Sequence, residues 1–435
     1  MKTLPRALAA VTGLALASLT ISAAQAADVN AAPTRWSNSG GEFASGAGFA
    51  RAQSVAVTST GARVYVGSTE GTGARVVGFT PNVNNANAYV SDSRLYGTKS
   101  GLASSYGLTM DRSGRLWTAD PINKTVSRFA ASAVTGNPEN STPQLTISGP
   151  NTGLEAPTDV AFAPNGDVLV TDNGSTNRVL RVYAADGGGN TAPKSVIDLG
   201  FGGVTGVAVD SKGLIYVANA GLDSIQVYAA GATTGASAIR TIAGPDTALH
   251  TPTQLAIDSS DNLYVANRNN GAIPGGTSVA VFAPGADDDA APIARLTGPS
   301  TTLDHPNDVA LDADRNVYVV GAVDPVSNSL LTKFAPLVPF TVPSAARSIS
   351  VSGSSKSSTR KISWHSPTNT GGTPITKYKV LVKHGSKTIY NKTTTSRSYT
   401  VKRSTLSNGT NTVTITAVNK VGNAPGAKKS FTVKK

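Results

Sequence analysis

The chain has 435 residues, enough for two or three domains, and no cysteine, which excludes a disulfide framework, a thiol nucleophile and a cysteine zinc site. Charged residues make up 15% and hydrophobic residues 39% of the chain, which excludes a disordered tail or a coiled coil. The formal charge of +12 is unevenly divided. Residues 341–435 carry 17 Lys and Arg and no acid, whereas residues 27–340 carry 19 Lys and Arg against 26 acids.

Residues 1–26 have the composition of a secretory signal peptide. Lys2 and Arg6 precede an apolar stretch from Ala7 to Ile21, and Ala24-Gln25-Ala26 is a small-x-small cleavage site. The apolar stretch is shorter than the about 20 residues that a transmembrane helix needs, and no later apolar run is long enough to span a bilayer. We therefore expect cleavage after Ala26 and a secreted protein that is extracellular or associated with the cell wall.

A pattern of short strands recurs six times between residues 55 and 336, at intervals of 47 to 54 residues. Each unit has a first strand with a small central residue, a tight turn, a second strand and usually two more strands. Four strands per unit, without a helix signal, are typical of a β-propeller, because the innermost strands converge on an axis with little room. A series of β-sandwiches is the alternative, but each unit is too short to fold alone. The central residues are Ala56, Thr109, Ala161, Ala208, Ala256 and Ala310.

The turn after each first strand carries a residue suited to a hairpin. Such hairpins need a residue at positive φ, which Gly and Asn tolerate best. Four of the units have Gly at this position, and the last two have Asp261 or Arg315 followed by an asparagine. The glycines are Gly61, Gly114, Gly166 and Gly213.

The sixth unit has no fourth strand after Leu330–Phe334, and a segment that resembles the missing strand lies at the N-terminus. This segment, residues 32–40, begins with Ala-Pro, and Ala-Pro or Pro commonly precedes the other fourth strands. We expect it to pair with the third strand of the last unit, within a propeller that covers residues 27–336. Such pairing would join the two ends of the ring and remove an exposed edge.

The run Pro252–Asp258, followed by Asn262–Asn267, resembles a blade of the NHL-repeat type of β-propeller. Three connectors between units are almost one sequence, at residues 149–157, 244–252 and 298–306. The resemblance covers about residues 32–336. It implies an all-β fold with six blades, and it implies no particular activity.

Residues 344–435, which follow a Pro-rich linker at 337–343, resemble a fibronectin type III module. The matching runs are Ile362–Pro367, Gly371–Val380 and Ala417–Gly422. The resemblance implies a β-sandwich in which Trp364 and Tyr378 are partners in the core. The tyrosine expected near the start of a later core strand is missing. Asn411 or Thr412 stands there, so this corner must be held differently.

In layout the propeller also resembles six-bladed calcium-dependent lactonases, which hold their metal just before the innermost strands. The matching positions offer only neutral oxygens, whereas Ca²⁺ prefers several anionic ones. Asp159 and Asp308 lie one residue further on, where strand alternation predicts that they point to the opposite side. We therefore expect no metal or other cofactor, and Ca²⁺ or Mg²⁺ only under the enzymatic alternative. The matching positions are Gln53, Tyr106, Thr158, Thr205, Thr253 and Asn307.

A second enzymatic alternative is a site that resembles that of streptogramin lyases, with a histidine, an acid and a metal. His250 and His305 stand in two neighbouring connectors and are its only candidates for catalysis. In another unit the positions before the connector proline hold Glu155 and Ala156. A role as linker residues that face water is therefore the simpler interpretation.

Polar residues follow the second strand in four of the units and are candidates for binding a carbohydrate or a peptide at the mouth of the channel. The alternative is that they cap turns, which Asp and Asn side chains often do. These residues are Asp120, Asp172, Asn173, Asn219, Asn267 and Arg268.

The acid-free tail predicts attraction to extracellular or cell-wall polyanions, with Lys377, Lys379, Lys383, Lys402 and Arg403 as candidate contacts. Docking of the tail onto the acidic propeller is the alternative. Nucleic acid is disfavoured, since no basic stripe is interleaved with aromatic residues and the chain is exported. Together these features favour a monomeric secreted binding or scaffold protein. The alternative is a metal-assisted propeller hydrolase or lyase.

Overall fold

The computed structural model describes residues 27–38, 51–69, 75–95, 97–130, 141–175, 177–200, 202–269, 276–322 and 329–434. The expected signal peptide and residues 39 and 40 of the expected closing segment lie outside these ranges. No helix within them is long and apolar enough to cross a membrane. Apart from strands, the named elements are short 3₁₀ turns: η2 (Thr98–Ser100), η4 (Pro150–Thr152), η5 (Pro245–Thr247), η6 (Pro299–Thr301) and η7 (Arg403–Thr405).

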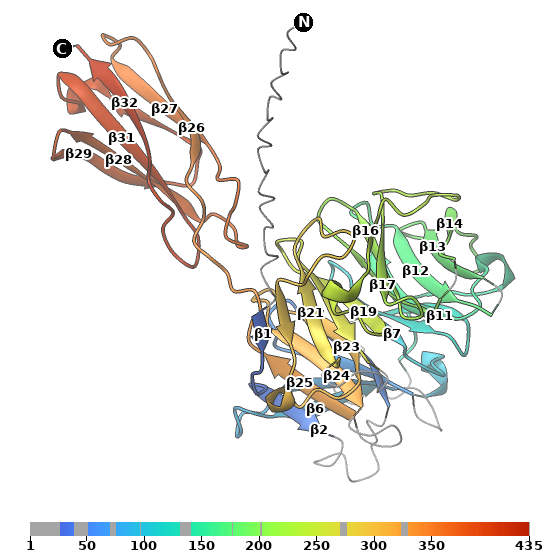
Figure 1. The fold of residues 1–435 in the computed structure, drawn as a ribbon. Helices are drawn as coiled ribbons and strands as arrows, with labels where there is room; N and C mark the ends of the chain where they lie inside the picture. Colours follow the sequence, from blue (N-terminus) through green and yellow to red (C-terminus); the bar gives the residue numbers. More distant parts are fainter. Residues whose placement is uncertain are drawn as a thin grey trace, which may run out of the picture.

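The protein is all-β, and its larger part is a propeller. Six sheets in the described residues, here called blades 1 to 6, follow one another around a central axis (Figure 1). The innermost strand of each blade contacts that of the next, and the innermost strand of blade 6 contacts that of blade 1, so the ring closes. The predicted β-propeller is confirmed.

Each blade runs outward from its innermost strand. Blades 1 and 2 contain β3 (Ala52–Val57), β4 (Val64–Ser68), β5 (Arg75–Pro81), β6 (Tyr89–Leu95), β7 (Gly107–Met110), β8 (Leu116–Asp120), β9 (Thr125–Phe129) and β10 (Leu145–Ile147). Blades 3 and 4 contain β11 (Pro157–Phe162), β12 (Val168–Asn173), β13 (Arg178–Tyr183), β14 (Ser195–Asp198), β15 (Val204–Val209), β16 (Ile215–Asn219), β17 (Ser224–Tyr228) and β18 (Arg240–Ile242). Blades 5 and 6 contain β19 (Pro252–Ile257), β20 (Leu263–Asn267), β21 (Ser278–Phe282), β22 (Ala294–Leu296), β23 (Pro306–Leu311), β24 (Val317–Ala322) and β25 (Ser329–Phe334).

The N-terminal segment supplies outer strands to two blades. β2 (Arg35–Asn38) pairs antiparallel with β25 and is the fourth strand of blade 6. β1 (Ala27–Val29) pairs parallel with β22 and adds a fifth strand to blade 5. Sequence analysis does not predict this second pairing, because a strand of three residues has no periodic signal.

All six hairpins between first and second strands have a residue at positive φ at the predicted position. The four glycines have φ values between 67° and 90°, and Asp261 and Arg315 have values of 63° and 64°. The asparagines that follow these two residues do not adopt positive φ. Asn316, for example, donates a side-chain hydrogen bond to Asp312 at 2.7 Å and so supports the turn from outside.

The C-terminal part is a sandwich of two antiparallel sheets, here called the tail domain (Figure 1). Trp364 and Tyr378 are buried between the sheets with ring centroids 5.3 Å apart. One sheet has the order β26 (Arg347–Ser352), β27 (Thr359–His365) and β30 (Ser398–Lys402). The other has the order β29 (Lys387–Thr394), β28 (Lys377–His384), β31 (Gly409–Val418) and β32 (Ala427–Val433).

Asn411 holds the corner at which the tyrosine is missing. Its side chain is fully buried, and its amide nitrogen donates to the carbonyl oxygens of Ser407 and Gly409 at 2.7 and 3.1 Å. Its side-chain oxygen accepts from the Ser407 N–H at 3.3 Å. A buried amide thus satisfies the backbone of this turn.

Candidate functional site

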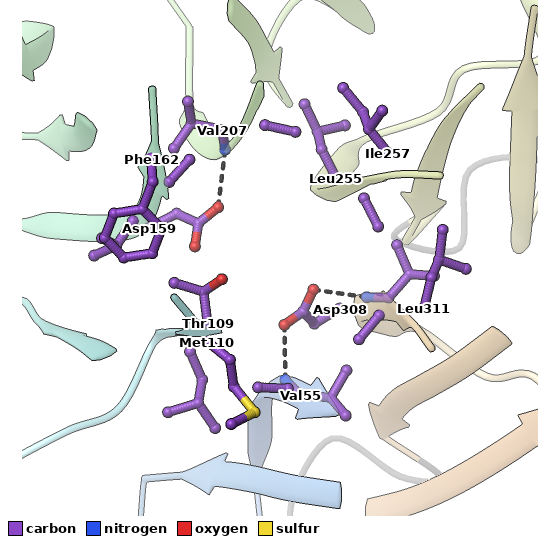
Figure 2. A pocket seen from close by; sticks show the side chains of 18 of the residues that line it. Val55, Thr109, Met110, Asp159, Phe162, Val207, Leu255, Ile257, Asp308 and Leu311 are labelled. Atoms are coloured by element: carbon purple, nitrogen blue, oxygen red, sulfur yellow. Dashed lines mark hydrogen bonds between the residues drawn. The ribbon is translucent and has the colours of Figure 1, made fainter. Parts of the chain in front are cut away.

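A cavity of about 380 Å³ lies at the centre of the ring and is here called the channel. The innermost strands of all six blades form its walls, and most wall residues are apolar. The small central residues of these strands leave the axis open, as their positions predict. Figure 2 shows wall side chains that include those of Val55, Met110, Phe162, Leu255, Ile257 and Leu311.

The channel opens toward the hairpins that join first and second strands. It shares five wall residues with a second cavity of about 770 Å³, which lies between these hairpins and the tail domain. The channel wall includes none of the six residues that match the lactonase metal positions, five of which are the second residue of an innermost strand, so the channel stops short of the opposite face. That opposite face carries the connectors and the loops of the predicted ligand residues. The shared residues are Val57, Met110, Arg112, Ile257 and Leu311.

Four of these six residues, each the second residue of its innermost strand, join neighbouring blades. Each donates a side-chain hydrogen bond to a backbone carbonyl of the following blade. The bonds run from Thr158 to Thr205, Thr205 to Pro252, Thr253 to Pro306 and Asn307 to Ala52, at 2.9, 3.2, 3.2 and 2.7 Å. These polar side chains therefore hold the ring together.

Asp159 and Asp308 point into the channel, contrary to the expectation from strand alternation (Figure 2). The reason is a register shift of the β-bulge kind at the start of both strands, between Pro157 and Asp159 in β11 and between Pro306 and Asp308 in β23. A bulge inserts a residue and re-aims the side chains around it. The sequence carries no residue that signals this bulge.

Each of the two carboxyl groups bridges adjacent blades. Asp159 Oδ2 accepts a hydrogen bond from the Val207 N–H of blade 4 at 2.8 Å. Asp308 Oδ2 accepts from the Val55 N–H of blade 1 at 2.7 Å, and its Oδ1 accepts from Val309 N–H at 2.6 Å. The backbone donors keep the carboxyl groups at fixed positions at the inner end of the channel.

Both acids hold their protons more strongly than ordinary aspartates. Burial raises the pKa of Asp159 to about 7, although hydrogen bonds from the Val207 and Val160 N–H groups act in the opposite direction. Burial and the nearby charge of Asp159 raise the pKa of Asp308 well above its usual value. Near neutral pH the two groups therefore carry less than two negative charges between them.

The same strand position in blade 5 holds a third acceptor. The Gln254 side chain is 6% exposed, and its Oε1 is buried without a hydrogen-bond partner among the described residues. In blades 2 and 4 this position is glycine, where a Cβ would come within 2.7 Å of Asp159 Oδ1 or 2.4 Å of Gln254 Oε1. Gly107 and Gly206 therefore provide the space that these acceptors fill.

Asp120 and Asp172, two of the predicted ligand residues, are fully buried on the opposite face. The Asp120 carboxylate accepts from Ser104 Oγ at 2.6 Å and from Ala103 N–H at 2.7 Å. The Asp172 carboxylate accepts from Ala156 N–H at 2.6 Å and from Arg181 Nε at 2.7 Å. This geometry shows the turn-capping role that the sequence left open, and burial does not favour the role in ligand binding.

The other predicted ligand residues divide into buried and partly exposed ones. Asn219 and Asn267 are fully buried, and Asn267 Oδ1 accepts from the His250 backbone N–H at 3.3 Å. Asn173 and Arg268 are partly exposed. Asn173 lines a separate cavity of about 640 Å³ together with Lys124 and other residues of blades 2 and 3. None of them lines the channel.

The two candidate histidines also lie outside the channel wall. His305 Nδ1 is 2.5 Å from the carboxylate of its neighbour Asp304, and both side chains are partly exposed. No group of three or more His, Asp or Glu in the described ranges could hold a metal ion. Two carboxyl groups that already accept backbone hydrogen bonds do not fit Ca²⁺, which takes 6–8 oxygen ligands, or the octahedral preference of Mg²⁺.

The predicted polyanion contacts lie on two different sheets of the tail domain. Lys377, Lys379 and Lys383 alternate with buried residues along β28, so they project from the outer face of the four-stranded sheet. Lys402 ends β30 in the other sheet, and Arg403 begins η7. The structure therefore brings three of the five together in one row.

Comparison with known proteins finds distant structural likenesses. No family model matches the chain, and no curated protein matches it by sequence. A putative gluconolactonase has 13% identity and a TM-score of 0.47, over 72% of this chain and 98% of that one. A gluconolactonase from Xanthomonas campestris has 15% identity and a TM-score of 0.45, over 72% and 98%. The WD40 β-propeller domain of Doa1 has 11% identity and a TM-score of 0.42, over 65% and 93%. Likenesses this distant carry no argument about chemistry.

Proposed function

We propose that the protein is a secreted ligand-binding protein that takes a small molecule into its channel, with the tail domain as an attachment to cell-envelope polyanions. The channel supports this proposal, because mostly apolar side chains and two fixed carboxyl groups line one cavity of about 380 Å³. Binding pockets for small molecules have this composition, with few polar groups that fix orientation. From the sequence motifs we propose that the larger domain is an NHL-like propeller and that the smaller one is a fibronectin type III module.

The row of Lys377, Lys379 and Lys383 supports the attachment. These side chains alternate on one strand, so they share the outer face of a sheet. Lys428 on β32 is also exposed, and it pairs with Thr414, whose other neighbour is Leu381 of β28. A cationic face of this kind attracts anionic polymers in a manner that depends on salt.

A metal-assisted hydrolase or lyase has less support. The polar side chains at the start of the innermost strands mostly donate to neighbouring blades, and the candidate histidines lie away from the channel. The remaining acids of the channel do not fit the metal. We therefore place the ligand site in the channel rather than among the loops of the opposite face.

Filling the channel tests this proposal. Thr109 points into the channel from β7, so Thr109→Phe should occupy it (Figure 2). A thermal-shift screen with small amines, acids, sugars and alcohols should find compounds that raise the Tm of the parent protein and not that of Thr109→Phe. Circular dichroism and the Tm without ligand would show that the variant is folded. The proposal is wrong if no compound binds, or if every compound binds both proteins equally.

A further inference from the structure

The inner end of the channel is rich in hydrogen-bond acceptors and poor in donors. Asp159 and Asp308 line it from blades on opposite sides of the ring. Gln254, at the same strand position in blade 5, has an unpartnered buried oxygen but is not one of the residues that line the channel. The channel wall contains no lysine, histidine or second arginine among the described residues, and its one cation is Arg112. A group that supplies several donors and a positive charge would therefore complement this end.

The side chains of the channel wall between this end and its opening are mostly apolar, although polar atoms make up the larger share of the wall surface that faces the cavity. Val, Leu, Ile, Met and Phe side chains form its wall on all sides. Asp308 and Leu311 both line it and are three residues apart on one strand, which corresponds to about 10 Å at about 3.3 Å per residue. A narrow hydrocarbon chain fits such a wall better than a polar or branched body does.

Arg112 marks the open end of the channel. It lies in the hairpin of blade 2, its side chain is exposed, and it lines both the channel and the cavity beneath the tail domain. A positive charge at this place repels a second cation on a ligand and attracts an anion. The two ends of the channel thus differ in the charge that they prefer.

We propose that the channel binds an organic ammonium ion, with the ammonium group between Asp159 and Asp308 and an apolar chain extending toward Arg112. This inference rests on the proposed ligand-binding function and specifies the class of ligand. An ammonium group brings three donors to a site with two carboxyl groups, and its charge replaces the proton that the carboxyl pair otherwise holds.

The proposed exchange makes binding depend on pH. Alkylamines stay protonated below their pKa of about 10, so the ligand charge is constant near neutrality. The site must lose its proton before the ammonium binds, and burial raises the pKa of Asp159 to about 7. Asp308 and Arg112 are the other charged groups of the described wall. Affinity should therefore fall as the pH decreases through 7, by up to about tenfold per pH unit.

Four probes with a six-carbon chain separate the contributions. Hexylamine, hexanol, hexamethylenediamine and aminohexanoic acid share the chain and differ only at their ends. Isothermal titration with the full-length protein should show that hexylamine binds at least about tenfold more tightly than hexanol, since a desolvated charge pair is worth more than a neutral hydrogen bond. The diamine should bind more weakly than hexylamine, and aminohexanoic acid at least as tightly. Arg112→Gln should remove this difference.

Asp159→Asn and Asp308→Asn test the ammonium site directly. Asn keeps an oxygen that accepts from Val207 or Val55 N–H, so the bridges between blades can persist. Each variant should weaken hexylamine and leave hexanol unchanged. His250→Ala, on the opposite face, is the control and should leave both unchanged.

The outcomes separate this inference from the function on which it rests. If hexanol binds as tightly as hexylamine and Thr109→Phe abolishes both, the channel is a ligand site but the ammonium inference is wrong. The inference also fails if hexylamine binds the two Asn variants as tightly as the parent protein. If none of the four probes and no compound of the wider screen binds, both the inference and the proposed function fail.

Discussion

At the scale of single residues, Asp159 and Asp308 have two roles in the ring. Each carboxyl group accepts a backbone hydrogen bond from the next blade, and each faces the channel. Their protonated forms suit the buried site better than their charged forms, because burial raises both pKa values. The same residues therefore join blades and give the channel its charge.

We expect Asp159→Asn to become more stabilising relative to the parent protein as the pH rises. The pKa of Asp159 is raised from 3.8 to about 7 by folding. A group with a raised pKa contributes its stability below its unfolded pKa, and this contribution is lost as the pH rises through the folded pKa. The difference in Tm between variant and parent should therefore increase by a few degrees between about pH 4 and about pH 8.

Thermal unfolding followed by circular dichroism across this pH range measures the difference. Asp186→Asn, at an exposed turn of blade 3, is the matched control for the loss of one carboxylate. A constant difference in Tm for Asp159→Asn would show that Asp159 titrates alike in the folded and unfolded states.

At the scale of elements, the repeat and its turn residues predict the blades well. The small central residues follow from the limited space near the axis, and the Gly of the hairpins follows from the positive φ of the turn. Both requirements are local, so they are visible in a sequence. The bulges that aim Asp159 and Asp308 into the channel are not visible, because strict alternation is the only signal that a short strand carries. Strand alternation therefore predicts the wrong side of the strand for Asp159 and Asp308.

Ring closure by the N-terminal segment can be tested by truncation. Deleting residues 27–41 removes β1 and β2 and exposes the edges of β22 and β25. We expect the Tm to fall by about 5–15 °C, since blade 6 loses its outer strand. Deleting only residues 27–31 removes β1 and should lower the Tm by less. Equal, small effects of the two deletions in a thermal scan would contradict closure by β2.

The lysine row on β28 gives a second prediction at this scale. Replacing Lys377, Lys379 and Lys383 with Gln should lower the salt concentration at which the full-length protein elutes from heparin. The control replaces Lys361, Lys402 and Arg403 of the other sheet and removes the same charge. A larger shift for the β28 variant is expected. Equal shifts for the two variants would mean that the overall charge of the tail domain, and not this row, governs retention on heparin. Retention that does not depend on the salt concentration would contradict an electrostatic attachment.

At the scale of the whole molecule, Arg315 connects the propeller to the tail domain. Its side chain is 4% exposed, pairs with Asp258 at 3.1 Å and donates to the Val338 carbonyl of the linker at 3.2 Å. Its guanidinium carbon also lies 4.3 Å from the ring centroid of Phe340, which Lys420 of the tail domain approaches from 4.1 Å. These contacts place the tail domain beside the opening of the channel.

Arg315→Ala should loosen this connection. The variant leaves Asp258 buried with fewer partners and removes the contact with Phe340, so we expect a loss of about 3–5 kcal/mol in stability. Small-angle scattering should show a broader distribution of domain separations. Lys212→Ala, which replaces an exposed cation in a hairpin of the same face, is the control. An unchanged scattering curve for Arg315→Ala would mean that the linker alone fixes the arrangement.

The sequence predicts the propeller, the sandwich-like tail and the division of charge, but not the face on which the channel opens. The predicted ligand residues follow the second strands, where Asp120 and Asp172 instead bind the backbone. Polar residues that cap turns and polar residues that bind ligands look alike in a sequence. The contacts among Arg315, Phe340 and Lys420, and the cavity between the hairpins and the tail domain, show in the structure that the tail domain borders the open end.

The absence of cysteine makes one measurement especially direct. Ala256→Cys places a single thiol on the channel wall. Ser237→Cys, which places a thiol at an exposed position, is the control. The rates at which small cationic and anionic methanethiosulfonates label the two variants can then be compared. If the channel is open and admits ammonium ions, the Ala256→Cys thiol should react. Its preference for the cationic reagent over the anionic one should be well above that of the Ser237→Cys thiol. Hexylamine should slow the reaction at Ala256→Cys. A thiol that does not react, or that shows the same charge preference as the exposed control, would contradict the account.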